Sequence, residues 1–249
     1  MLYNRLRADP TLTVPPRTFF FAGKAAPAYR LAKLIIKLIN NVGRVIDEDP
    51  ASRGRIKVVF LPNYNVTLAE RLIPASDVSE QISTAGYEAS GTGNMKFMMN
   101  GALTIGTRDG ATIEMAQEAG EENFFLFGLT AEQVASSRGW YSPRWHYENE
   151  PEARQALDLI FNDHFSRDEP GLFAPIRETL LERGDYYMHL ADLLSYVQAQ
   201  QRLGALYADP DAWTRMAIRN VACCGKFSSD RTIEDYAADI WKTMPCPVS

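Results

Sequence analysis

The sequence lacks the features that mark secreted, membrane-spanning and metal-binding proteins. It has 3 cysteines in 249 residues, at positions 223, 224 and 246, and an odd number with two adjacent does not make a disulfide framework. No Cys/His pattern has the spacing of a metal site. No apolar run approaches the roughly 20 residues that cross a bilayer, and the polar N-terminus does not resemble a signal peptide. We therefore expect a cytoplasmic protein with reduced thiols and no metal or membrane contact.

An excess of positive charge is also missing. The 26 Lys and Arg residues are outnumbered by 31 Asp and Glu residues, which gives a net charge of −5. Nothing therefore favours attraction to nucleic acid or to an anionic membrane. With 249 residues, 46% of them hydrophobic and 23% charged, the chain can bury a large core and lies near the upper end for a single α/β domain.

Short apolar runs that alternate with amphipathic segments predict strands followed by helices. Strands are expected at residues 18–23, 56–61, 103–107 and 124–127, and helices at 67–73 and 112–119. A further helix is predicted by the apolar stripe of Leu31, Leu34, Ile35, Leu38, Val42 and Val45. This order is typical of an α/β fold with a doubly wound, Rossmann-like parallel sheet. We expect one sheet to contain Phe19, Phe21, Val58, Phe60, Ile105, Phe125 and Phe127.

The strand signals stop after about residue 139. Helices are expected from there on, at residues 151–161, 173–183, 189–207, 210–221 and 232–241. This tail packs as a helical layer on the sheet or forms a small separate domain. Because no Pro/Gly/Ser-rich linker precedes it, we favour one unit spanning residues 1–249, with a core at about 17–140 and a helical tail at about 141–249.

Residues 84–110 are the most informative stretch, because six glycines lie among small side chains there. Such a backbone can approach a ligand closely, and its N–H groups can surround an anion, helped if a helix begins near Asn94. Lys96 would then lie beside the anion. The stretch is not a P-loop, because Met95 and Phe97 flank the lysine, and it is not a dinucleotide fingerprint, because Lys96 stands where the third glycine is needed.

The stretch Glu88-Ala-Ser-Gly-Thr-Gly-Asn-Met-Lys96 resembles the sugar and cofactor loop of the α-glucan (glycogen, starch and maltodextrin) phosphorylases. Similar runs cover nearly the whole chain in family order, including Gly23-Lys-Ala-Ala-Pro27, Ser79-Glu-Gln-Ile-Ser-Thr-Ala-Gly86 and Gly225-Lys-Phe-Ser-Ser-Asp-Arg-Thr232. The resemblance is to the C-terminal part of those enzymes. It implies the C-terminal half of a two-domain GT-B glycosyltransferase architecture.

The resemblance also implies roles for individual residues. Lys96 matches the lysine that holds pyridoxal 5′-phosphate as a Schiff base, and it is the one catalytic residue that the resemblance assigns. Cofactor contacts are implied for Thr92, Gly93, Tyr64, Gln81 and Lys24. Glucose contacts are implied for Glu88, Ala89, Ser90 and Gly91. Asn65 departs from the family, some of whose members carry a basic residue there.

The implied reaction is phosphorolysis of α-1,4-glucan to α-glucose 1-phosphate, with the cofactor phosphate exchanging a proton with substrate phosphate. The family's phosphate-binding arginine and lysine lie upstream of the first residue here, as does the N-terminal domain that closes the cleft. Two hypotheses follow. The chain is the cofactor domain of a phosphorylase, or it is a truncated and inactive cofactor-binding or regulatory module. A nucleotide-sugar glycosyltransferase is disfavoured, because that class has no need of Lys96.

Overall fold

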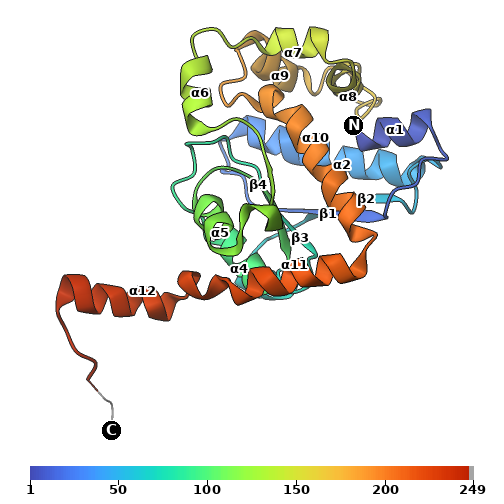
Figure 1. The fold of residues 1–249 in the computed structure, drawn as a ribbon. Helices are drawn as coiled ribbons and strands as arrows, with labels where there is room; N and C mark the ends of the chain where they lie inside the picture. The colour runs from blue at the N-terminus through green and yellow to red at the C-terminus, as the bar shows by residue number, and fades with distance from the viewer. Residues whose placement is uncertain (247–249) are drawn as a thin grey trace.

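The computed structural model describes residues 1–246. Its strands lie at the centre and its helices surround them (Figure 1). The strands are β1 (Arg17–Ala22), β2 (Ile56–Leu61), β3 (Val78–Gln81), β4 (Leu103–Thr107) and β5 (Phe125–Phe127). The helices before and between them are α1 (Leu2–Ala8), α2 (Arg30–Glu48), α3 (Val66–Leu72), α4 (Gly93–Met99) and α5 (Ala111–Ala119).

All strand pairs are parallel, as the alternation of strand and helix predicts. Strand β1 pairs with β2, and Phe19 lies opposite Val58. Strand β4 lies between β3 and β5, and Ile105 lies opposite Phe125. The α/β class is therefore confirmed. The strands do not form the single sheet that we expected, because β1–β2 is one sheet and β3–β4–β5 is another.

Polar side chains of a tail helix, α10 (His189–Tyr207), join the two sheets. Arg17 of β1 donates to the Gln200 side-chain oxygen at 2.7 Å, and the Gln200 amide donates to Glu80 of β3 at 2.6 Å. The hydroxyl of Tyr196 donates to the other Glu80 oxygen at 2.8 Å. Within residues 1–246 these side-chain contacts link β1 to β3, and no backbone ladder pairs the two strands. Strand β3 was not predicted, because Ser-Glu-Gln makes no apolar run.

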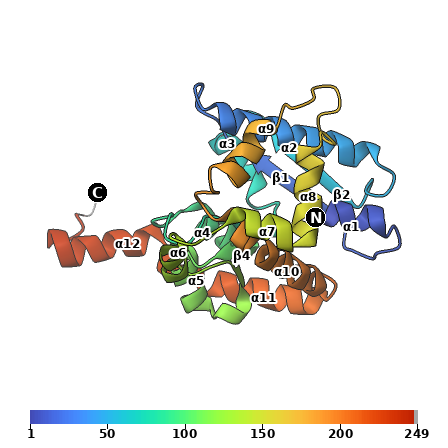
Figure 2. The ribbon, with the colours of Figure 1, turned by 90° about the horizontal axis from the view of Figure 1, so that it is seen from above.

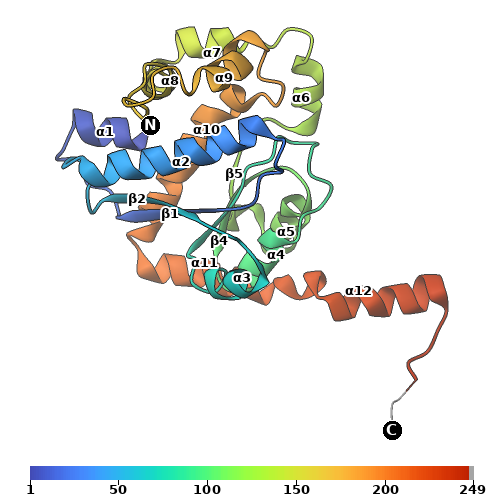
Figure 3. The same cartoon turned by 180° about the vertical axis from the view of Figure 1, so that it is seen from behind.

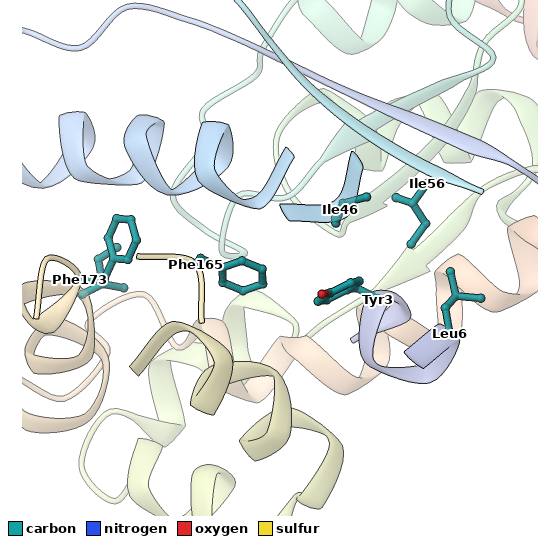
Figure 4. Close-up of a cluster of buried hydrophobic side chains, with 7 residues drawn as sticks. Tyr3, Leu6, Ile46, Ile56, Phe165 and Phe173 are labelled. Carbon is teal, nitrogen blue, oxygen red and sulfur yellow. The ribbon is translucent and has the colours of Figure 1, made fainter. Parts of the chain in front are cut away.

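The most extensive buried cluster packs the N-terminal segment against the tail (Figure 4). Its members are Tyr3, Leu6, Ile46, Ile56, Phe165, Phe173 and Ile176. Helix α1 supplies the first two and was not predicted, because it is only 7 residues long. Most of the apolar stripe expected on α2 packs on this cluster. Ile35 does not, and 43% of it is exposed.

The predicted helical tail is present, and no strand follows Phe127 in the part of the chain that the structure describes. Its helices are α6 (Ala131–Ser137), α7 (Pro143–Asn149), α8 (Pro151–Phe161), α9 (Ala174–Arg177), α10, α11 (Pro210–Ala222) and α12 (Ser229–Asp235). Helices α9 and α12 continue as π-helical turns at Glu178–Glu182 and Tyr236–Trp241. Helices α6 and α7 were not predicted. Residues 247–249 of the expected tail lie outside the described residues.

Two features of the arrangement bear on the site. Helix α10 crosses the molecule beside β4 and β5, whereas α12 extends away from the body (Figures 1 and 3). Seen from above, α4 and α5 lie on the side of the molecule from which α12 departs (Figure 2). None of the helices in residues 1–246 combines the length and apolarity of a membrane span.

Candidate functional site

The segments that follow β3 and β4 come together at one edge of their sheet. These neighbouring strands are parallel, so their carboxyl ends open on the same side. The contact is direct, because the N–H of Ala111 donates to the Ser90 carbonyl at 2.6 Å. The sheet therefore holds residues 82–92, which contain the predicted glucose loop, against the turn at residues 108–110.

One buried carboxylate orders this loop. Asp109 has 6% of its surface exposed and is the second residue after β4. One of its oxygens accepts the N–H of Gly86 at 2.8 Å. The other accepts the N–H of Glu88 at 2.9 Å and the hydroxyl of Ser83 at 2.7 Å. Asp109 was not among the predicted site residues, although an aspartate at the carboxyl end of a parallel strand was the signal available.

The turn after β4 leaves no room for a side chain. Gly110 has φ of +50°, and a Cβ built there would lie 2.5 Å from the Ser90 carbonyl oxygen and 3.0 Å from Glu88 Cγ. A residue with a side chain would therefore push the loop away from β4. At Gly110, the close approach is between two segments of this chain.

Helix α4 turns Lys96 toward solvent. Its neighbours Asn94 and Met98 are buried, with 2% and 0% of their surfaces exposed. The Asn94 amide donates to the Thr112 hydroxyl at 3.2 Å, which pins α4 to α5. Because side chains two residues apart on a helix point in nearly opposite directions, Lys96 lies on the exposed face. It makes no ion pair within residues 1–246.

Unpaired donors lie one turn before this lysine. The N–H groups of Thr92, Gly93 and Asn94 have no backbone acceptor in the described part of the chain. The Thr92 hydroxyl makes no capping bond to the helix. A Cβ at Gly93 would meet no atom within 4 Å, so the space beside these donors is open. Donors of this kind, with a lysine amine nearby, are suited to a phosphate group.

The remaining predicted residues divide between the two sheets. Glu88, Ala89 and Ser90 are exposed on the loop after β3, and the Gln81 amide at its start donates to Ser79 at 3.0 Å. Lys24 and Tyr64 follow β1 and β2, so they share one edge of the other sheet. No hydrogen bond or ion pair joins either of them to residues 84–96 in the region that the structure covers.

Asn65 has a local structural role. Its side-chain oxygen accepts the N–H of Leu68 at 3.0 Å, which makes it the N-cap of α3. A basic side chain cannot accept this hydrogen bond. Where some family members carry a basic residue beside the position of Tyr64, this chain therefore has a helix cap.

Comparisons with known proteins identify the family of the chain. A family model described as carbohydrate phosphorylase matches residues 1–243. The brain form of glycogen phosphorylase from Homo sapiens is 54% identical over 245 residues, which are 98% of this chain and 29% of the relative. The muscle form from Oryctolagus cuniculus is 54% identical over 246 residues, with the same shares covered. The chain thus spans 29% of the length of these relatives. By both measures, the chain belongs to the carbohydrate phosphorylase family.

Proposed function

We propose that this chain is the C-terminal, cofactor-carrying part of an α-glucan phosphorylase, which splits α-1,4-glucan with phosphate to give α-glucose 1-phosphate. One observation carries the proposal: the exposed amine of Lys96 lies one turn after the unpaired donors of residues 92–94, in a chain that matches the family over residues 1–243. The alternative of an inactive module shares this site and differs only in the chemistry that follows binding.

The residues at this site fit pyridoxal 5′-phosphate. The free amine of Lys96 suits the cofactor's aldehyde, and the N–H groups of Thr92, Gly93 and Asn94 suit its phosphate. The open space at Gly93 leaves room for that phosphate. When bound, the cofactor supplies a phosphate group that exchanges a proton with the substrate phosphate. Tyr64, Gln81 and Lys24 remain proposed cofactor contacts that depend on family resemblance.

The loop before these donors suits a sugar. Glu88 presents an exposed carboxylate, and Ala89, Ser90 and Gly91 present backbone groups beside it. Glucose hydroxyls are both donors and acceptors, so a carboxylate flanked by peptide groups can hold several of them. Asp109 keeps the loop in position, because it binds the backbone N–H of Glu88. We assign Asp109 a positioning role, since it acts through the loop.

A second domain would complete this site. We propose that residues of about 17–140 form the Rossmann-like core of the C-terminal half of a GT-B enzyme, and that the N-terminal phosphorylase domain packs against it. The exposed end of β1 supports this partner, because 51% of Phe20 and 40% of Phe21 is open to solvent. Because successive side chains of a strand point to opposite faces, each face of this strand end carries an exposed phenylalanine that another segment can cover.

Reductive labelling tests the cofactor assignment. The chain is incubated with pyridoxal phosphate, treated with borohydride, digested and mapped by mass spectrometry. We expect one dominant labelled peptide, carrying Lys96, and no label there in Lys96→Ala. Lys33→Ala is the matched control, because Lys33 is exposed on α2. Equal labelling of wild type and Lys96→Ala would overturn the assignment.

A further inference from the structure

Three exposed tyrosines and one arginine form a cluster beside the proposed glucose loop, here named the tyrosine platform: Tyr87, Tyr186, Tyr187 and Arg138. The Tyr87 ring centroid is 6.1 Å from that of Tyr186 and 5.3 Å from that of Tyr187. The Arg138 guanidinium lies over the rings of Tyr87 and Tyr186, at 5.4 Å and 4.9 Å. The three tyrosines are 40%, 62% and 46% exposed, in the order given.

The backbone holds two of these rings in solvent at a cost in conformational energy. Asp185 and Met188, on either side of Tyr186 and Tyr187, both have positive φ, at 44° and 53°. Such angles are unfavourable for residues other than glycine and persist where surrounding structure enforces them. Here the enforcing contacts are visible. The buried Asp185 carboxylate accepts the Tyr141 hydroxyl at 2.8 Å and the N–H of Leu190 at 2.9 Å.

The inner side of this segment is anchored as well. Met188 is buried in a cluster with Ala85 and Val134. The Thr84 hydroxyl donates to the Tyr187 carbonyl at 2.6 Å. Tyr87 directly precedes Glu88, whose N–H is held by Asp109. The platform and the loop from Thr84 to Glu88 are therefore one packed unit, in which Tyr87 and Glu88 are adjacent in the chain.

The chemistry of the platform fits a neutral polymer of sugars. A pyranose ring has apolar C–H faces and hydroxyl groups around its edge, so it stacks on an aromatic ring and binds polar atoms beside it. Tyrosine provides both parts, an apolar face and a polar tip. An anionic ligand is disfavoured by the carboxylate of Glu88, which follows Tyr87 in the loop.

We propose that the tyrosine platform binds an α-1,4-glucan chain, with Tyr186 and Tyr187 stacking on glucose units that lie outside the loop at Glu88. This inference rests on the proposed function, since it takes its ligand from the glucose loop beside it. It adds a subsite for glucose units beyond the one at Glu88, so a chain of several units should bind more tightly than a single glucose.

Binding of maltoheptaose, measured by isothermal titration to the chain carrying reduced cofactor, tests the platform. For the double variant Tyr186→Ala/Tyr187→Ala we expect the Kd to rise at least tenfold, which corresponds to about 1.4 kcal/mol. Tyr186→Trp keeps a stacking face and should bind like wild type. Tyr236→Ala is the control, since that tyrosine is 45% exposed in the projecting C-terminal helix.

The outcomes separate this inference from the proposed function. Labelling of Lys96 reports the cofactor site, and we expect it to be unchanged in the double variant, which also shows that the variant is folded. Absence of maltoheptaose binding in wild type, an unchanged Kd in the double variant, or an equal loss in Tyr236→Ala would each overturn the platform. The platform would also be overturned if the double variant kept its affinity for maltoheptaose but no longer associated with a second polypeptide, because the tyrosines would then form a protein interface.

Discussion

Removing the Asp109 carboxylate should release the loop that carries the proposed glucose contacts. Its oxygens accept three hydrogen bonds, from Gly86, Glu88 and Ser83, at 2.7–2.9 Å. Bonds to a charged acceptor contribute about 1.5–3 kcal/mol each when both partners are buried. Gly86 and Glu88 are exposed, so water replaces part of what is lost. At about 1 kcal/mol for each bond, Asp109→Ala should lower the free energy of unfolding by about 3 kcal/mol.

Urea denaturation measures this loss, and hydrogen exchange locates it. We expect amide exchange to accelerate most at residues 83–91, and in the β1–β2 sheet only by as much as the loss of global stability allows. Asp109→Asn keeps the shape but turns an amide NH₂ toward one of the donors, so it should cost about 2 kcal/mol. Asp230→Asn, at an exposed aspartate of α12, is the control. If Asp109→Ala left stability and loop exchange unchanged, the positioning role would be refuted.

Three further outcomes are expected. A Cβ at Gly106 would lie 3.1 Å from the Gln81 carbonyl oxygen, so Gly106→Ala should lose about 1–3 kcal/mol in thermal unfolding, whereas Gly139→Ala, in open space, should lose little. Burial, with nearby arginines, lowers the pKa of His164 from 6.5, so its contribution to stability is present above pH 6.5 and is lost as pH falls through the folded-state pKa. When the pH is lowered from about 7 to about 5, the free energy of unfolding of His164→Gln should therefore fall less than that of wild type. The chain loaded with cofactor should release no glucose 1-phosphate from glycogen and phosphate, because it does not contain the phosphate-binding arginine and lysine that stabilise the transition state in the family. Turnover of about 1 per second would contradict this.

Elements with a strong apolar pattern could be predicted from the sequence. Strands β2 and β4 and helices α8 and α10 have the bounds that the periodicity indicates, and every strand pair is parallel. Strand β3 was not predicted, because its side chains are mostly polar and it is held in the sheet by backbone pairing with β4. The division into two sheets was also missed, because it depends on the contacts of Gln200, more than a hundred residues away from both β1 and β3.

The candidate site was predictable only in part. The glycine-rich motif marks Lys96 and the loop before it, since those residues are local in sequence. Asp109 and the tyrosine platform were not predicted, because each depends on contacts between distant segments. Tyr187 meets Thr84 only once α10 is packed against the loop. Such contacts leave no periodic signal in one sequence.

The most direct test of the central claim is a crystal structure of the chain after reaction with pyridoxal phosphate and borohydride. We expect continuous density from Lys96 Nζ to the cofactor ring, with the phosphate against the N–H groups of Thr92, Gly93 and Asn94. Density attached to another lysine, or a phosphate bound away from residues 92–94, would contradict it.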